Sequence, residues 1–269
     1  MTTSVLITGA NSGIGYQTAL SLLRSTKTTY KIFVGARSIE KASSAVVSLK
    51  DEAKDTKSDV SPLVVDLEDD ESIKKAFEEV SGKIDKLDVL VNNAGINIDM
   101  QGLKEGLTDR QIFNKSWDVN VTGTQIITKT FVPLLIKSTN PRLIFLTTSM
   151  SSLTISEYPQ PHFNQSPPAG WPKQNPDFWS YKSTKLGLVM IMRDWYKTLK
   201  NDNVKTWAIN PGLVATNLGG DPDFLKAIGA GDPAVSGNLV ISVIEGGRDN
   251  DVGKMLGAKE DIFGDIVPW

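Results

Sequence analysis

The sequence predicts an α/β fold built on a doubly wound parallel sheet with helices on both faces. Short runs rich in β-branched residues alternate with longer amphipathic runs along most of the chain, an order that is typical of parallel strands joined by helices. The strand runs are apolar almost throughout, as in strands that are covered on both faces. A glycine-rich turn follows the first run, at the edge where such sheets bind ligands.

The predicted elements follow one another without an internal repeat or a linker, so we expect one domain over residues 1–269 and a sheet of about seven strands. Strands are predicted at residues 4–8, 30–36, 60–66, 86–93, 142–149 and 204–210. Helices are predicted at residues 14–25, 39–54, 70–82, 110–137 and 179–200. Residues 150–178 break this rhythm with six prolines and no sustained period. An inserted loop of this length is usually functional or disordered, and its aromatic residues argue against plain disorder.

Composition excludes several kinds of site. The net charge of −2 leaves no basic surface to attract nucleic acid or an anionic membrane. The chain has no cysteine, which excludes disulfides, cysteine-ligated zinc and thiol nucleophiles. A single histidine, His162, argues against a histidine metal site and against a Ser-His-Asp triad. With no apolar run near the roughly 18 residues of a membrane span and no signal peptide, we expect a cytoplasmic protein without metal.

The turn TGANSGIG, residues 8–15, predicts a phosphate-binding site. Its glycines let the backbone approach a diphosphate, and the helix that follows offers free N–H groups and a partial positive charge. The turn lacks the Gly-Lys-Ser/Thr of a P-loop, which disfavours ATP and GTP. Together these features predict a Rossmann-type dinucleotide site, although tight turns need glycine for conformation alone.

The end of the second strand run indicates which dinucleotide is bound. NAD enzymes of this fold usually place an acid there to bind the ribose 2′-OH, but this chain has Ala36 followed by Arg37 and Ser38. A guanidinium at this point suits a 2′-phosphate, which it binds through charge-assisted hydrogen bonds. We therefore favour NADP(H), against the alternative that Arg37 is a solvated arginine at a strand end.

Tyr181 and Lys185 lie four positions apart in a run that predicts a helix, so both side chains leave the same face. A free phenol has a pKa near 10, and a neighbouring ammonium favours the phenolate. The pair therefore suits proton transfer to or from a substrate. By itself this spacing also occurs by chance on surface helices.

These motifs, in order along the chain, resemble those of the short-chain dehydrogenase/reductase family. The glycine-rich turn resembles the family's TGxxxGxG turn, NNAG at 92–95 resembles a signature that lines the cofactor site, and residues 181–185 resemble the YxxxK motif. The resemblance covers residues 4–257. It implies four catalytic residues, which are Asn120, Ser149, Tyr181 and Lys185. It also implies cofactor contacts from Gly9, Asn11, Ser12, Gly13, Ile14, Gly15, Arg37, Asp66, Leu67, Asn93, Ala94, Gly95, Tyr181, Lys185, Pro211, Gly212, Val214 and Thr216.

The resemblance also implies a role for each catalytic residue. Tyr181 exchanges a proton with the substrate oxygen, and Ser149 hydrogen-bonds the same oxygen. Lys185 lowers the pKa of Tyr181 and binds the nicotinamide ribose, while Asn120 holds a water that links Lys185 to solvent. Neighbouring hydroxyl residues are alternatives to Ser149 in this role. The alternative for Asn120 is that it only marks a kink in the helix and has no catalytic role.

The chain departs from the common family pattern in the 32 positions that separate Ser149 from Tyr181. The surplus is the 150–178 insertion, and it resembles a subset of NADPH-dependent carbonyl reductases. In that subset the insertion can cover the helix used for tetramer packing. The apolar helix 179–200 is buried either by this insertion or by a partner's copy, and the sequence does not decide between them, although we favour a monomer or homodimer over a tetramer. We expect an apolar carbonyl substrate, such as a bulky ketone, aldehyde or quinone. The hypothesised pocket wall is made of Phe163, Trp171, Phe178 and Trp179, with a substrate-side segment at 213–231 that includes Leu218 and Phe224.

Three functions are consistent with this fold. The first is NADPH-dependent reduction of a carbonyl or oxidation of an alcohol. The second is a non-catalytic NADP(H)-binding regulator, which would tend to lose the tyrosine or lysine that this chain keeps. The third is another reaction such as dehalogenation, whose relatives tend to lose the glycine-rich turn that is intact here. An aromatic pocket wall has its own alternative, in which those residues only fasten the insertion to the body.

Overall fold

The strands of the computed structural model form one sheet in the order β3-β2-β1-β4-β5-β6-β7-β8. The structure describes residues 2–160, 164–173, 178–258 and 262–269. The strands are β1 (Thr2–Ile7), β2 (Thr29–Ala36), β3 (Asp59–Val64), β4 (Val89–Asn92), β5 (Arg142–Leu146), β6 (Lys205–Asn210), β7 (Met255–Gly257) and β8 (Ile266–Val267). Strands β1 to β7 pair in parallel, and only β8 runs antiparallel to its neighbour β7. The predicted doubly wound α/β sheet is confirmed, with a short eighth strand added at its edge.

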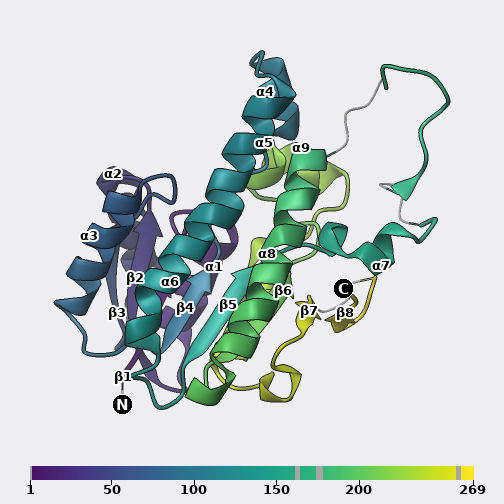
Figure 1. The fold of residues 1–269 in the computed structure, drawn as a ribbon. Coiled ribbons are helices and arrows are strands. Elements are labelled where there is room, and N and C mark those ends of the chain that lie inside the picture. The colour runs from purple at the N-terminus through teal and green to yellow at the C-terminus, as the bar shows by residue number, and fades with distance from the viewer. Residues whose placement is uncertain (1, 161–163, 174–177, 259–261) are drawn as a thin grey trace.

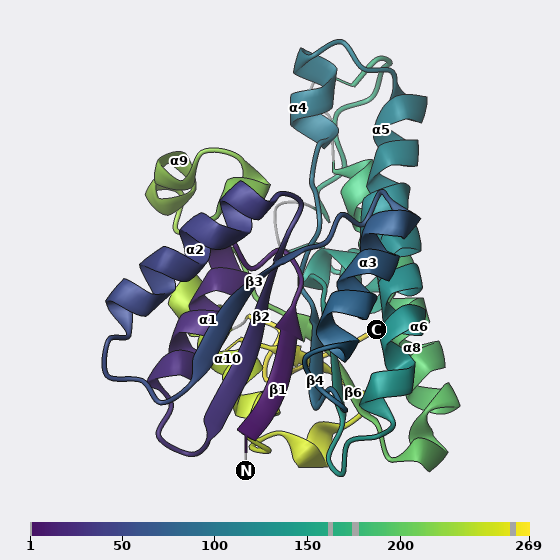
Figure 2. The ribbon, with the colours of Figure 1, turned by 90° about the vertical axis from the view of Figure 1, so that its left-hand side faces the viewer.

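Helices cover both faces of the sheet, as Figures 1 and 2 show. The longer ones are α1 (Gly13–Arg24), α2 (Ile39–Glu52), α3 (Asp70–Ser81), α5 (Asp109–Trp117), α6 (Thr124–Leu135), α8 (Trp179–Thr198) and α10 (Pro233–Ile244). Apolar residues of α1, α2 and α10 form one buried core with the sheet, and those of α3, α6 and α8 form a second core on its other face. The two cores fix the sheet, and thereby the edge at which the parallel strands end.

Four helices and one irregular turn were absent from the sequence prediction. The helices are α10, α4 (Asp99–Lys104), α9 (Pro222–Ala227) and the short α7 (Leu153–Ser156) inside the insertion. The predicted helix 110–137 is divided by a π-helical turn, η1, at Asp118–Gly123. Such turns frequently mark functional sites, and this one contains Asn120. The prediction of a kink at Asn120 is therefore correct in position.

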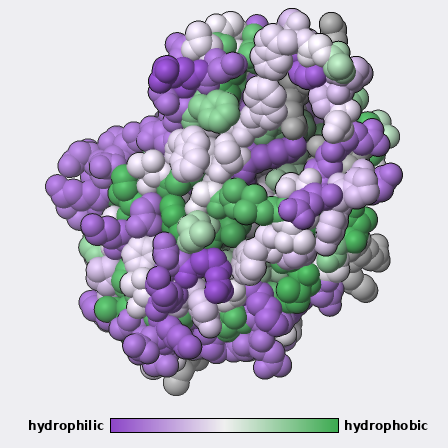
Figure 3. Space-filling model, turned by 45° about the vertical axis from the view of Figure 1, so that its right-hand side comes forward, coloured by the Kyte–Doolittle hydropathy of each residue, from purple (hydrophilic) through white to green (hydrophobic). Residues whose placement is uncertain are grey.

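The described part of the insertion leaves the outer face of α8 open. After the turn η2 (Ser149–Ser151) and the short helix α7 (Leu153–Ser156), the chain extends away from the body (Figure 1). Met190 of α8 is 63% exposed and Trp117 of α5 is 39% exposed. Apolar side chains are interspersed with polar ones on the face shown in Figure 3. The start of the insertion does pack on this helix, through η2 and through Ile155, which is buried in the same core as Leu188 and Met192. Whether the insertion or a partner copy covers the outer face at Met190 stays open.

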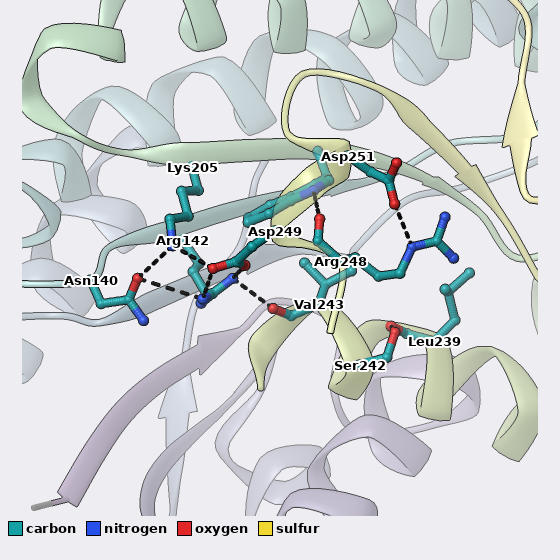
Figure 4. A network of polar contacts seen from close by, with 10 residues as sticks. Asn140, Arg142, Lys205, Leu239, Ser242, Val243, Arg248, Asp249 and Asp251 are labelled. Carbon is teal, nitrogen blue, oxygen red and sulfur yellow. Dashed lines mark hydrogen bonds and ion pairs between the residues drawn. The ribbon is translucent and has the colours of Figure 1, made fainter. Parts of the chain in front are cut away.

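A buried arginine ties the sheet to the chain that leads into β7, at the edge opposite the glycine turn (Figure 4). Arg142 is 3% exposed, and it donates two hydrogen bonds to the carboxylate of Asp249, at 2.6 and 3.1 Å. It also donates to the carbonyl of Val243 at 2.8 Å and lies 5.4 Å from the ring centroid of Trp207. Lys205 donates to the same Asp249 carboxylate. This carboxylate therefore balances a cation that has little access to water.

Replacing Asp249 by alanine is expected to lower the free energy of unfolding by about 2–3 kcal/mol, because it leaves the Arg142 guanidinium buried without its counter-charge. Urea unfolding monitored by circular dichroism measures this change. The matched control is Asp51→Ala, which breaks a pair with Lys54 whose side chains are each 73% exposed. Exposed pairs contribute little, so the control should change stability by less than about 0.5 kcal/mol. Equal effects in the two variants would contradict the assignment.

Candidate active site

A cleft of about 550 Å³ opens at the carboxyl ends of the central strands. Its walls come from the turn after β1, the ends of β2 and β3, the loop after β4, the end of β5, helix α8 and the chain after β6. In a doubly wound sheet this edge is where ligands bind, because the connections on either side diverge there. Residues that are far apart in sequence thus meet around one elongated space.

The glycine turn at the head of α1 has the shape that the sequence predicts. Gly9 and Gly13 have φ angles of +63° and +57°, a conformation that favours glycine. A Cβ on Gly9 would lie 2.9 Å from the Cα of Ala94. Ser12 precedes α1 but makes no side-chain cap hydrogen bond, and the first turn of α1 holds no acidic residue. The helix therefore presents free N–H groups and its positive end to the cleft.

Asn93 and Thr8 hold this turn against the loop after β4. The hydroxyl of Thr8 accepts hydrogen bonds from the amides of Asn93 and Ala94, at 3.0 and 2.9 Å. The side-chain amide of Asn93 donates to the carbonyls of Thr8 and Gly9, at 2.8 and 3.1 Å. Two segments of the predicted cofactor site are therefore fixed to each other before any ligand binds.

Two cations stand at one end of the cleft. Arg37 follows β2, and Lys41 lies in the first turn of α2; both are exposed and both line the cleft. In the described part of the chain neither side chain is paired with a carboxylate. Lys41 was missing from the sequence analysis, although its place four residues after Arg37 at a helix start could have indicated it. Together they form a site for a dianion such as a phosphate.

Tyr181 and Lys185 meet on the first turns of α8. Tyr181 is 9% exposed and Lys185 3%, and the ammonium lies 5.8 Å from the centroid of the tyrosine ring. The ammonium donates one hydrogen bond, of 2.9 Å, to the carbonyl of Leu146 at the end of β5. Both residues line the cleft, so the predicted juxtaposition on one helix face is confirmed.

In the protein without cofactor, burial sets the direction of the pKa shift of each member of this pair. It raises the pKa of the Tyr181 phenol above its ordinary value and lowers the pKa of the Lys185 ammonium to about 8, because each charged form loses its hydration. Burial alone sets this direction in the cofactor-free protein, so the expected lowering of the Tyr181 pKa by Lys185 stays a prediction. A phenol with a raised pKa keeps its proton at neutral pH, as a proton donor must.

Asn120 is fully buried in the π-helical turn, below the cleft. Its Oδ1 accepts from the amide of Ile96 at 2.7 Å, and its Nδ2 donates to the carbonyl of Ile96 at 2.8 Å and to Thr184 Oγ1 at 3.1 Å. A Cβ on Gly95 would lie 3.1 Å from Asn120 Oδ1 and 3.2 Å from Lys185 Nζ. Asn120 therefore fixes the loop after β4 beside Lys185 and retains one lone pair for a water. That water remains a prediction.

Ser149 begins the turn η2, which packs against α8, and its amide donates to the Asn210 side chain at 3.0 Å. It does not line the cleft, whereas its neighbours Leu146 and Thr147 do. The structure therefore brings the turn of Ser149 to α8, the helix of Tyr181 and Lys185, and the contact of Ser149 with a substrate oxygen stays a prediction.

The segment 213–231 closes over the turn from the other side. A parallel bridge joins Val214 to Gly231, and Thr216 lies against the glycine turn, since a Cβ on Gly13 would approach Thr216 Cγ2 to 3.2 Å. Its cleft-lining residues are Thr216, Asn217, Leu218 and Gly220. The segment therefore bounds both the cofactor turn and the space beyond it.

Most of the predicted site residues line one cleft. Those that do are Gly9, Asn11, Ser12, Gly13, Ile14, Arg37, Asp66, Leu67, Asn93, Ala94, Gly95, Tyr181, Lys185, Pro211 and Thr216. The predicted residues outside its lining are Gly15, Asn120, Ser149, Gly212 and Val214. Gly15 has a packing role, since a Cβ there would lie 2.6 Å from the Asn93 side chain. Lining residues that the sequence analysis missed include Lys41, Ile96, Ile98, Gln101 and Asn217.

The hypothesised aromatic wall is not found in the cleft. Trp171 is 78% exposed, Trp179 50% and Phe224 62%, and neither they nor the half-buried Phe178 line the cleft. Phe163 and His162 lie outside the described residues. Of the described members of the hypothesised set, only Leu218 lines the cleft, as do Ile96 and Ile98. The described apolar lining is aliphatic because the insertion projects away from the body.

Comparison with known proteins places the chain in a family. The family model for short chain dehydrogenase matches residues 3–160. The chain belongs to the short-chain dehydrogenase/reductase family. A curated member, short-chain dehydrogenase/reductase tropE of Talaromyces stipitatus, is 44% identical over 260 residues, which are 94% of each chain. Another, eupG of a Phoma species, is 42% identical over 98% of this chain and 96% of its own length. The resemblance found in the sequence is thus confirmed, and with it the oxidoreductase class.

Solved structures of the family share the fold over nearly the whole chain. NADPH-bound carbonyl reductase from chicken fatty liver superposes with a TM-score of 0.78 at 22% identity, covering 99% of this chain and 98% of its own. An alcohol dehydrogenase from the archaeon Thermococcus sibiricus, complexed with 5-hydroxy-NADP, gives 0.72 at 24% identity over 91% of each chain. In the described part of this chain, none of the helices is both long and apolar enough to cross a membrane.

Proposed function

We propose that the protein is an NADPH-dependent reductase of apolar ketones, aldehydes or quinones. One observation carries the proposal: a single cleft has two unpaired cations at one end and the buried Tyr181–Lys185 pair among its other lining residues. The cations suit a 2′-phosphate, and the buried phenol suits proton donation to a carbonyl oxygen. The regulator alternative uses only the first of these features.

The residues present fit a dinucleotide. Gly9 and Gly13 hold the turn at the head of α1 in a positive-φ conformation, and a side chain on Gly9 would meet Ala94. This turn before a helix suits a diphosphate. Asp66 and Leu67 line the adenine end, with Arg37 and Lys41 beside them for the 2′-phosphate. Lys185 has donors left for ribose hydroxyls after its single hydrogen bond to Leu146. NADPH-bound carbonyl reductase, of the same fold, supports the choice of cofactor.

When bound, the nicotinamide supplies a hydride to the carbonyl carbon. The chain handles the proton that balances this step: the C=O double bond becomes a C–H and an O–H bond, and Tyr181 donates the O–H proton to the oxygen. Lys185 then faces a tyrosinate, which its positive charge stabilises until solvent returns a proton. Ser149 donates a hydrogen bond to the same oxygen in this proposal. A neutral Tyr181 phenol starts this step with the proton that it donates.

The substrate end favours apolar molecules. Ile96 and Ile98 from the loop after β4 and Leu218 from η5 (Asn217–Gly219) line the cleft. Apolar pockets with few polar groups bind apolar ligands and orient them by those groups. The nearby segment 213–231 adds exposed apolar side chains at Leu213 and Phe224.

Arg37→Ala and Lys41→Ala are each expected to raise the KM for NADPH about 10-fold, because each removes a charge-assisted hydrogen bond to the 2′-phosphate. The KM for NADH should stay within twofold, since NADH lacks that phosphate. Steady-state oxidation of both cofactors with menadione or benzaldehyde measures this. Lys197→Ala, which removes an 80% exposed lysine at the far end of α8, controls for net charge.

The outcomes separate the candidates. Equal losses with NADH and NADPH would contradict the 2′-phosphate site. Tight NADPH binding without turnover on any carbonyl or alcohol would favour the regulator.

Cytoplasmic location and a monomeric or homodimeric state remain parts of this proposal, and gel filtration with light scattering tests the latter.

A further inference from the structure

A buried carboxylate lies at the start of the helix that carries Tyr181. Asp99, the first residue of α4, is 5% exposed. Its Oδ1 accepts from the amide of Ser180 at 2.9 Å, and its Oδ2 accepts from the Ser180 hydroxyl at 2.8 Å and the Tyr181 amide at 3.0 Å. The backbone N–H groups of two successive residues, Ser180 and Tyr181, therefore both donate hydrogen bonds to one carboxylate from another helix.

This carboxylate serves as the cap that α8 lacks in its own sequence. Phe178 occupies the N-cap position of α8 and provides no side-chain hydrogen bond. The first N–H groups of a helix have no partner within it, and an anion is stabilised at that end. Asp99 forms no ion pair within the described residues, so the helix N-terminus and the Ser180 hydroxyl hold its charge.

The contact extends into a third helix. The hydroxyls of Ser180 and Ser116 lie 3.0 Å apart, and both residues are fully buried. Ser116 belongs to α5, one residue before Trp117 and the π-helical turn of Asn120. A chain of polar groups from Asp99 through Ser180 to Ser116 thus ties α4, α8 and α5 together beside the cleft. Buried polar groups satisfied in this way fix a single arrangement.

Asp99 also continues the loop that lines the cleft. Ile96, Asn97 and Ile98 precede it directly and all line the cleft, and Ile96 is held at both backbone groups by Asn120. The loop after β4 is therefore fixed at two points, to η1 by Asn120 and to the head of α8 by Asp99. The second point acts on the backbone of Tyr181 itself.

We propose that Asp99 is a positioning residue, which sets the place of the Tyr181 phenol by fixing the first turn of α8 to the loop beside the cofactor. This inference rests on the proposed function, in which Tyr181 donates a proton to the substrate oxygen. A displacement of about 1 Å in a reacting group can lower the rate about 100-fold. The effect of losing Asp99 therefore falls on the chemical step, because the cofactor end with Arg37 and Lys41 is untouched.

The test is Asp99→Asn, which keeps the shape of the side chain but sets an amide N–H₂ against groups that are themselves donors. With NADPH and menadione, kcat is expected to fall about 10- to 100-fold. The KM for menadione and the Kd for NADPH, from cofactor fluorescence, should change less than threefold. Asp69→Asn is the matched control, since Asp69 caps α3 by accepting from Glu71 at 3.0 Å. It should leave kcat unchanged.

Two results would overturn the proposal: a folded Asp99→Asn variant with the parent kcat, or equal losses in kcat and NADPH affinity. If that variant does not fold, Ser180→Ala, which removes one of the three donors, should lower kcat about 2- to 5-fold with unchanged NADPH affinity. Unchanged kcat in this variant would count against the proposal.

Amide hydrogen exchange makes the test independent of the proposed function. In Asp99→Asn the amides of Ser180 and Tyr181 should exchange faster, with no change at Glu71. If the parent protein reduces no carbonyl, the proposed function fails, while this exchange still decides whether Asp99 holds the head of α8. Slow exchange in the variant would show that it does not.

Discussion

Replacing Tyr181 by phenylalanine is expected to lower kcat for carbonyl reduction by about 10²- to 10⁴-fold, the usual contribution of a positioned acid. The change removes one hydroxyl from a side chain that is 9% exposed, so the ring continues to fill its place. The Kd for NADPH should stay within about threefold, because Tyr181 is one of many expected cofactor contacts and the phosphate contacts come from other residues. Stopped-flow oxidation of NADPH with menadione or benzaldehyde separates the chemical step from product release.

The control for this variant is Tyr158→Phe. Tyr158 lies on the insertion, is 43% exposed and does not line the cleft, so its kcat should equal that of the parent. Turnover retained in Tyr181→Phe would mean that another group donates the proton, and Ser149 would be the next residue to replace. A parallel loss in both variants would indicate damage to the fold.

Lys185→Met is expected to lower kcat/KM by at least about 100-fold and at the same time to stabilise the cofactor-free protein at neutral pH by about 2–3 kcal/mol. The ammonium is 3% exposed and donates a single hydrogen bond, to Leu146. Burial lowers its pKa to about 8, so at pH 7 the folded state holds a proton at an unfavourable site. A methionine of similar length removes that cost.

The pH dependence follows from the same pKa. Between pH 8 and about 10 the unfolded state keeps the Lys185 proton while the folded state has lost it, so the free energy of unfolding rises with pH. From pH 7.5 to 9.5 this group alone adds about 2 kcal/mol to the parent. Burial raises the folded-state pKa values of Tyr16 and Tyr30 to about 12. Because these phenols begin to titrate near pH 10 in the unfolded chain, they oppose the rise only slightly at the upper end of this window. Urea unfolding at both pH values measures the rise.

Lys185→Met should lack this rise, whereas Lys197→Met, at an 80% exposed position, should retain it. If the parent and Lys185→Met depended on pH in the same way, Lys185 would titrate normally in the folded protein. The activity loss would then have to be explained without a buried charge.

The parts of the fold that sequence could predict are those with a strong period. The six predicted strands and the helices around residues 14–25, 39–54 and 70–82 are all present, because the strands are apolar runs buried on both faces and the helices each bury one regular face. Helix α10 was not predicted, because its sequence PAVSGNLVISVI is apolar on most sides and shows no clear helical period. The start of α10 could nevertheless have been predicted, since Asp232 caps the helix and Pro233 occupies its first position. Strands β7 and β8 are too short to show any period.

The candidate site was predictable where chemistry needs a fixed spacing, as between Tyr181 and Lys185 or among the glycines of the first turn. The site residues that the sequence did not predict are those brought together by the packing of separate helices, strands and loops. Lys41 joins Arg37 only because α2 starts where it does, and Asp99 reaches Tyr181 through a loop that has no sequence period. The direction of the Tyr181 pKa shift could not be predicted for a similar reason. Spacing gives proximity, but the depth of burial that raises the pKa of Tyr181 comes from the whole packed core.

The bridge between Val214 and Gly231 makes the segment between them a loop whose two ends are fastened to each other. Hydrogen bonds from Ala215 to Gly231 and from Gly231 to Leu213 close it at its base. Changing the length of such a loop costs little, since doubling it adds only about 0.6 kcal/mol of closure entropy. Changes in the length of this loop beyond its cleft-lining residues are therefore expected to leave the sheet undisturbed, so that the far side of the cleft can be reshaped while the strands that carry the rest of its walls keep their places.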